Sequence, residues 1–98
     1  MRGPLELKRG EMVLGTLRPY DMDDPWLLCK FEPTAAFAEI APLFLQELAV
    51  IQDADNTKWI NAYSEIEQLG LRLVPVDNGE EISEFLLHID DNEAWFRY

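Results

Sequence analysis

The strongest constraint on this fold is the apolar segment from Thr34 to Gln52, TAAFAEIAPLFLQELAVIQ. Glu39, Gln46 and Glu47 are assigned to the opposite, solvent-facing side of the helix that this segment predicts. A helix so apolar needs a covering surface, and the flanking segments read as strands that supply one. The apolar residues recur at intervals of three and four, which places them on one helix face: Phe37, Ile40, Ala41, Phe44, Leu45, Leu48 and Ile51.

Pro42 interrupts this pattern, because proline inside a helix removes a hydrogen bond and clashes with the preceding turn. Two alternatives follow. The segment is either a kinked helix over 35–52, or a short turn over 34–40 followed by a helix with Pro42 at its first position. The interrupted or kinked form, with most of its length after Pro42, is expected. Thr34 is the expected N-cap.

The remaining elements predict an α+β fold in one domain, residues 1–98. A second helix is expected from Thr57 to Leu69, with Gly70 as its C-cap. We expect an antiparallel β-sheet of about five strands with two helices packed on one face, in the order β-β-(β)-α-α-β-β-β. Residues 5–20 are expected to form either a pair of strands that turns near Gly10 or one bent strand, and Pro19 is expected to end the strand. Tyr20–Pro25 is the expected loop. The other predicted strands are Trp26–Phe31, Leu71–Val76, Phe85–Ile89 and Ala94–Tyr98. Gly15 inside the first run indicates a bulge or a close backbone approach.

Charge is the most unusual property of the composition. The chain has a net charge of −11. Residues 1–20 hold four bases and two acids, whereas residues 21–98 hold four bases and seventeen acids. A field of this sign repels nucleic acid and anionic lipid and attracts basic proteins. No nucleic acid or membrane is therefore expected as a partner.

The single cysteine and the lengths of the apolar runs indicate the cellular compartment. Cys29 alone excludes an internal disulfide framework and fits a reducing compartment. No signal peptide is recognised, and no apolar run approaches the ~18–20 residues that span a bilayer. A cytoplasmic protein is expected.

Two acidic groups, Asp21/Asp23/Asp24 and Asp53/Asp55, raise the question of calcium binding. Neither has the glycine that an EF-hand loop needs at its sixth position, where Trp26 and Lys58 stand. Solvated loops are the simpler interpretation, so no metal and no cofactor is expected.

Cys29 and His88, the only thiol and the only imidazole, form one candidate catalytic pair. A cysteine inside an apolar strand usually behaves as a small buried hydrophobe, and His88 is expected to face solvent. No phosphate loop, nucleophile elbow or metal-protease motif is present. A non-enzymatic protein is predicted.

The tryptophans give the best indication of a partner surface. On the last strand Trp95 and Arg97 share one face, and an uncovered sheet face would expose such aromatics as a patch for a second copy of the chain or for another protein. Trp59 lies on a helix stripe and is assigned to the core. The expected partner-binding residues combine this patch with the acidic residues: Asp21, Asp23, Asp24, Trp26, Glu80, Glu81, Asp90, Asp91, Glu93, Trp95 and Arg97.

The stretches YDMDDPW (20–26) and EAWFRY (93–98) resemble those of short, uncharacterised bacterial proteins. That resemblance implies no activity. In architecture and acidity the chain is also similar in kind to immunity proteins and antitoxins, which neutralise basic toxin domains by charge complementarity. We therefore expect an acidic protein-interaction module, with self-association as one mode and an immunity- or antitoxin-type inhibitor as the alternative.

Overall fold

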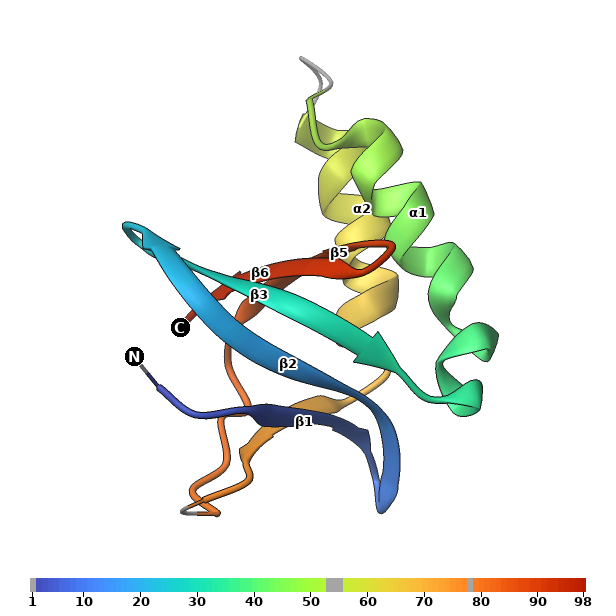
Figure 1. The fold of residues 1–98 in the computed structure, drawn as a ribbon. Coiled ribbons are helices and arrows are strands. Elements are labelled where there is room, and N and C mark those ends of the chain that lie inside the picture. The colour runs from blue at the N-terminus through green and yellow to red at the C-terminus, as the bar shows by residue number, and fades with distance from the viewer. Residues whose placement is uncertain (1, 53–55, 78) are drawn as a thin grey trace.

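The computed structural model describes residues 2–52, 56–77 and 79–98. These residues form an α+β fold with six antiparallel strands, two α-helices and one short 3-10 helix (Figure 1). The class confirms the sequence prediction, while the count of about five strands is corrected to six. The elements are β1 (Leu5–Arg9), β2 (Met12–Asp23), β3 (Trp26–Pro33), η1 (Ala35–Glu39), α1 (Ala41–Val50), α2 (Asn56–Glu67), β4 (Leu71–Pro75), β5 (Leu86–Asp90) and β6 (Glu93–Arg97).

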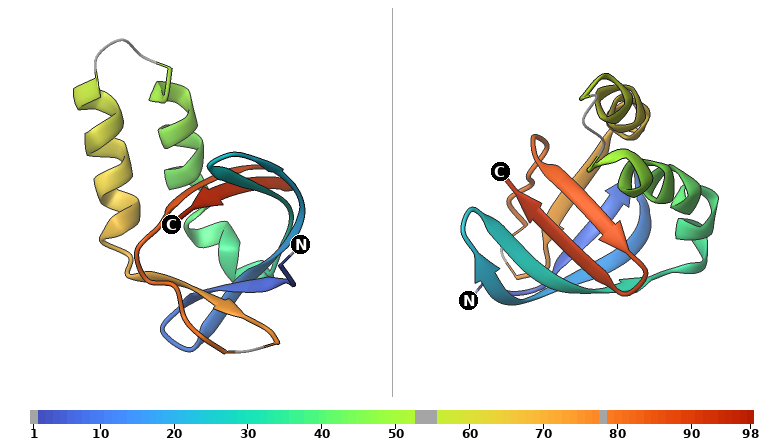
Figure 2. Two further views of the ribbon diagram at one scale, coloured as in Figure 1. Left: turned by 90° about the vertical axis from the view of Figure 1, so that its left-hand side faces the viewer. Right: turned by 90° about the horizontal axis from the view of Figure 1, so that it is seen from above.

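The six strands form one sheet in the order β4-β1-β2-β3-β6-β5. The sheet curls strongly, and α1 and α2 stand side by side as a hairpin next to β5 (Figures 1 and 2). The expected arrangement of two helices on one face of an open sheet is therefore corrected. The concave side of the curl encloses the core, and the helical hairpin packs against the β5 end of the sheet through α1.

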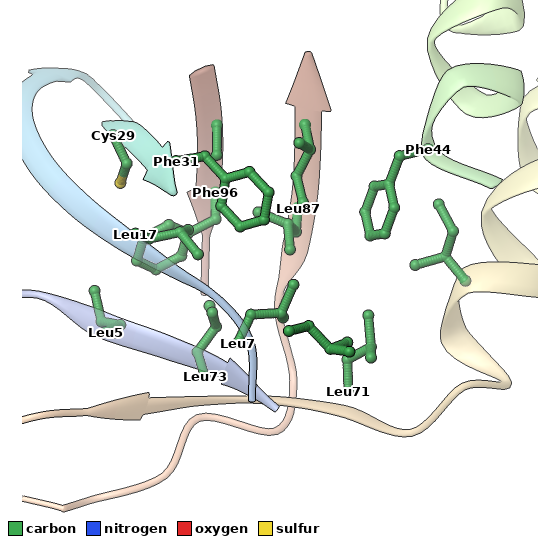
Figure 3. Close-up of a cluster of buried hydrophobic side chains, with 14 of the residues drawn as sticks. Leu5, Leu7, Leu17, Cys29, Phe31, Phe44, Leu71, Leu73, Leu87 and Phe96 are labelled. Atoms are coloured by element: carbon green, nitrogen blue, oxygen red, sulfur yellow. The ribbon is translucent and has the colours of Figure 1, made fainter. Parts of the chain in front are cut away.

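The core is built from the inward-facing residues of all six strands. Side chains from strands far apart in sequence converge there, and Phe44 reaches them from α1 (Figure 3). Each large apolar side chain buried in this way contributes roughly 1.5–3 kcal/mol to folding. The strand residues that are almost fully buried are Leu5, Leu7, Leu14, Leu17, Cys29, Phe31, Leu73, Leu87, Ile89, Ala94 and Phe96.

The apolar segment is interrupted before Pro42, as one of the two alternatives predicts. The 3-10 helix η1 ends at Glu39, and α1 begins at Ala41 with Pro42 in its first turn, where the missing amide hydrogen costs nothing. Thr34 is the N-cap residue of η1, as expected, but its side chain makes no capping hydrogen bond. Its hydroxyl donates instead to the carbonyl of Val13 at 2.8 Å, which ties the start of η1 to β2.

The predicted second helix and its ending are confirmed. α2 covers Asn56–Glu67, and Gly70 has the left-handed conformation, φ +68°, that terminates the helix. Asp53 and Asp55 lie outside the described residues.

Strand β2 is longer than expected. It continues through Pro19 to Asp23, so Pro19 does not end the strand and most of the predicted loop Tyr20–Pro25 is strand. The pairing with β3 shifts register between Pro19 and Asp21, which leaves Tyr20 as the extra residue of a bulge. A bulge accommodates proline because the ladder is already broken there.

Gly15 marks the close backbone approach that was predicted. A Cβ atom at this position would lie 2.6 Å from Cε1 of Phe31 and 2.9 Å from the carbonyl oxygen of Glu32. The absence of a side chain therefore lets β2 pass directly over the Phe31 ring.

Both edges of the sheet are at least partly covered within the described chain. On β5, the hydroxyl of Tyr63 accepts a hydrogen bond from the Leu87 amide at 2.8 Å and donates to the Phe85 carbonyl at 3.4 Å. On β4, Leu73 exchanges two backbone hydrogen bonds with Ile82. These contacts occupy edge groups that another strand would otherwise use.

Candidate functional site

The outer face of the sheet carries a straight row of side chains across four strands. Asp21 on β2 pairs with Leu28 on β3, Leu28 with Trp95 on β6, and Trp95 with His88 on β5. Because cross-strand partners point to the same side, all four lie opposite the core. Asp23 and its partner Trp26 extend the same face toward the β2–β3 turn. We call these six residues the tryptophan face.

His88 ends this row, and its imidazole is held by a buried carboxylate. Nδ1 of His88 lies 2.7 Å from Oε1 of Glu47 on α1, and the indole nitrogen of Trp59 on α2 donates to Oε2 of Glu47 at 2.7 Å. The side chains of Glu47 and His88 are 0% and 4% exposed. One carboxylate therefore joins α1, α2 and β5, and both of its oxygens accept a hydrogen bond.

Aromatic rings surround the imidazole. The ring centroids of Trp26, Trp95 and Tyr63 lie 5.2, 5.4 and 6.3 Å from that of His88. Tyr63 also stacks on Trp59, with centroids 5.5 Å apart. This packing fixes the orientation of His88 and binds the helical hairpin to the sheet.

A hollow of about 470 Å³ opens on the tryptophan face. Its walls come from β2, β3, β5 and β6 and from the C-terminal end of α1. Apolar surface dominates its lining, and Asp23 is the one carboxylate in it. The lining residues are Asp23, Trp26, Leu28, Ile51, His88 and Trp95.

An ion pair borders the hollow on the same outer face. The ammonium group of Lys30 binds Glu93, and the hydroxyl of Tyr20 donates to Glu93 at 3.0 Å. These hydrogen bonds, that of Lys30 first, lower the pKa of Glu93. The ammonium group also lies 4.9 Å from the ring centroid of Tyr20, so this cation is already engaged.

The structure separates the predicted partner-binding residues into three places. The largest group lies on or beside the tryptophan face. Asp90, the last residue of β5, pairs with Glu93, so the first group adjoins a second place at the β5–β6 turn, where Asp90 and Asp91 border a depression with Phe37 and Phe44. Glu80 and Glu81 follow β4, where Glu81 pairs with Arg72. The first group comprises Asp21, Asp23, Asp24, Trp26, Glu93, Trp95 and Arg97.

Cys29 and His88 do not form a pair. Cys29 pairs with Ala94 on the inner side of the sheet, whereas His88 pairs with Trp95 on the outer side. Burial raises the pKa of the Cys29 thiol to about 12, and the charge of Glu93 adds to this effect. The expectation that Cys29 behaves as a buried hydrophobe is confirmed.

Two predictions about this region were wrong. From the sequence, Glu47 is assigned to the solvent side of its helix and His88 to the surface. Both side chains are instead buried, and they contact each other. A single signal in the sequence was available. Glu47 falls between Phe44 and Ile51 on the helix face that carries the apolar residues, as its spacing of three from Phe44 and four from Ile51 shows.

Among the described residues, no helix is long and apolar enough to cross a membrane. No group of three or more histidine, cysteine or acidic side chains is placed there to hold a metal ion. Comparison of the chain with protein-family models, with curated proteins and with solved structures finds no match.

Proposed function

We propose that this protein is a non-enzymatic, acidic interaction module that binds a basic protein partner through the tryptophan face. The observation that carries the proposal is the hollow lined by Trp26 and Trp95 beside the carboxylate of Asp23. Tryptophan gives the largest contact area at protein interfaces and is enriched among the residues that dominate binding energy.

The charge around this face supports a basic partner. Asp21, Asp23 and Asp24 are exposed at the β2–β3 end of the face. The nearest cations are engaged within the chain, because Lys30 binds Glu93 and the Arg97 guanidinium carbon lies 5.5 Å from the centroid of the Trp26 ring. With a net charge of −11, the chain attracts cationic surfaces from a distance.

The environments of Cys29 and His88 favour a binding role over catalysis. The Cys29 thiol faces the core with a raised pKa, and His88 is packed among rings with one nitrogen committed to Glu47. The covered edges of β4 and β5 also favour contact through a face rather than through strand addition.

An affinity experiment tests this proposal. The wild-type chain and the variant Trp95→Leu serve as baits in extracts of the source cells, and proteins retained by the wild type alone are identified and purified. Direct titration of the purified partner at low and high salt follows. We expect a basic partner whose affinity falls with salt and with Trp95→Leu.

The variant Tyr98→Leu is the matched control, since it removes an exposed aromatic ring outside the tryptophan face. A partner that binds the wild type and Trp95→Leu equally well, or the absence of any partner specific to the wild type, would contradict the proposal.

An immunity- or antitoxin-type inhibitor is the second candidate, as a special case in which the basic partner is a toxin domain. Residues 21–98 contain seventeen acids and only four bases, and this acidic surplus favours an inhibitor of a basic toxin domain. Its test is inhibition of the purified partner's activity by stoichiometric amounts of the chain.

A further inference from the structure

The hollow on the tryptophan face contains a second polar group besides Asp23, the Nε2 atom of His88. His88 binds Glu47 through Nδ1, and no described residue pairs with its Nε2. No fully buried side-chain nitrogen or oxygen among the described residues lacks a partner, so Nε2 must reach the surface. His88 lines this hollow, which gives Nε2 its way out.

The hydrogen bond to Glu47 engages Nδ1 of His88 and leaves Nε2 as the polar atom of this side chain toward the hollow. The hollow therefore has the Asp23 carboxylate at one end and Nε2 of His88 at the other, with indole and aliphatic surface between them.

The distance between these ends defines the size of the ligand. Asp23 lies on β2 and His88 on β5, three strand spacings apart, which is roughly 14 Å across the strands at about 4.8 Å per spacing, and Asp23 is offset along β2 by two residues from Asp21, the residue in the row of His88. One side chain does not bridge that distance, whereas an extended segment of a few residues does. This segment needs a cationic head group for Asp23, apolar contact with the two indoles and a hydrogen-bonding group for Nε2.

We propose that the hollow binds a short extended segment of the basic partner, with an arginine side chain stacked on the tryptophans and paired with Asp23. This inference rests on the proposed function and names the chemistry that the face recognises. Arginine fits better than lysine because its planar guanidinium stacks on aromatic rings and pairs with a carboxylate through two hydrogen bonds. Arg97 already uses the Trp26 ring in this way.

Arg97 does not occupy the hollow itself. It lines a separate depression with Pro25, Leu86 and Tyr98. No arginine or lysine of the described chain lines the hollow, so no cationic side chain of this protein competes there with an incoming guanidinium group for Asp23.

The test uses three synthetic peptides that differ at one residue type: acetyl-Gly-Arg-Gly-Arg-Gly-amide, its citrulline analogue and its lysine analogue. Citrulline keeps the shape of arginine without the charge. Each peptide is titrated into the ¹⁵N-labelled chain, and the three indole N–H signals are followed by NMR. We expect the arginine peptide to shift the signals of Trp26 and Trp95, to leave Trp59 unchanged, and to bind about 5–30-fold more tightly than the citrulline peptide.

Two charge-matched variants complete the test. Asp23→Asn removes the carboxylate of the hollow and is expected to abolish the difference between arginine and citrulline. Asp91→Asn removes the same charge from the β5–β6 turn and is expected to preserve it. The indole signal of Trp59, which reports its bond to Glu47, shows that each variant is folded.

Equal binding of the arginine and citrulline peptides, equal binding of the arginine and lysine peptides, or an equal effect of both variants would overturn this inference. Its failure is distinguishable from failure of the proposed function. A partner that needs Trp95 but tolerates Asp23→Asn contradicts the arginine site alone. If the indole signals shift with the arginine peptide alone, but a partner binds the wild type and Trp95→Leu equally well, only the proposed function is contradicted.

Discussion

Oε1 of Glu47 lies 2.7 Å from Nδ1 of His88, and the two side chains have almost no contact with solvent. This pair joins α1 to the outer face of β5, and the bond from Trp59 brings α2 to the same carboxylate. A buried carboxylate is tolerated only when its oxygens are satisfied, and here both are. The position of the helical hairpin, and with it one wall of the hollow, therefore depends on one glutamate.

Replacement of Glu47 by alanine should destabilise the fold strongly. The change leaves Nδ1 of His88 and the indole N–H of Trp59 without their partner, and breaking a buried pair in this way typically costs about 3–5 kcal/mol. Urea unfolding followed by tryptophan fluorescence measures the loss. Gln46→Ala, at the exposed neighbouring position of α1, is the control and should change the free energy of unfolding by less than about 0.5 kcal/mol. Equal effects of the two variants would contradict the structural role of Glu47.

Replacement of Tyr63 by phenylalanine should destabilise the protein, because it removes the hydroxyl that binds the edge of β5. The Leu87 amide loses its acceptor inside the protein, and an unsatisfied buried donor costs roughly 1–3 kcal/mol. Tyr98→Phe removes an exposed hydroxyl and should have little effect. The same urea experiment at neutral pH compares the two variants, and similar stabilities would show that the edge does not need this cap.

The pH dependence of this effect has a defined sign. Burial, the largest cause, raises the pKa of Tyr63 from 10.0 to about 12. Below pH 10 the hydroxyl is protonated in the folded and unfolded chains alike, so its stabilisation is fully present. Between pH 10 and 12 the unfolded chain ionises first, and this stabilisation is lost. The difference in free energy of unfolding between the wild type and Tyr63→Phe should therefore shrink from pH 9 to pH 12, and a constant difference would contradict the shift.

Local sequence patterns predicted much of the fold because they depend on neighbours along the chain. The break before Pro42, the termination at Gly70 and the close approach at Gly15 each follow from the backbone chemistry of one residue. The same patterns failed at Pro19, because they do not include the bulge that lets β2 continue past a proline.

The candidate site could be predicted only in part, because its residues meet through long-range pairing. Trp95 and Arg97 were assigned to one face by alternation, and Trp26 was included as an aromatic candidate. The contact between Glu47 and His88 joins positions 41 residues apart, and a charge on a helix is normally assigned to water. The strand order, which puts β4 at the edge of the sheet opposite β5 and so keeps Glu80 and Glu81 away from the tryptophan face, depends on long-range pairing that no local pattern predicts.

Addition of a methyl group at Gly15 should destabilise the protein without changing its charge. In Gly15→Ala the new Cβ would overlap the Phe31 ring and the Glu32 carbonyl, and forced repacking of this kind costs typically 1–3 kcal/mol. Gly10→Asn is the control, since its position has open space and a left-handed backbone that asparagine tolerates. Thermal unfolding followed by circular dichroism should show a lower midpoint for Gly15→Ala than for Gly10→Asn. The reverse order would contradict the packing of β2 over Phe31.

The Cys29 thiol should be inert until the protein unfolds. It is fully buried, its pKa is raised to about 12, and only the thiolate reacts with disulfide reagents. At pH 8 the native chain should therefore react with an aromatic disulfide reagent at least ~100-fold more slowly than the chain in urea, because reaction has to wait for opening of the core. The reaction rate should rise with urea in parallel with unfolding, and Cys29→Ala should give no signal. The destabilised variant Gly15→Ala should react faster than the wild type under native conditions. Equally fast labelling of the native and unfolded wild-type chains would place the thiol at the surface. That result would contradict the assignment of β3 side chains to the inner and outer faces.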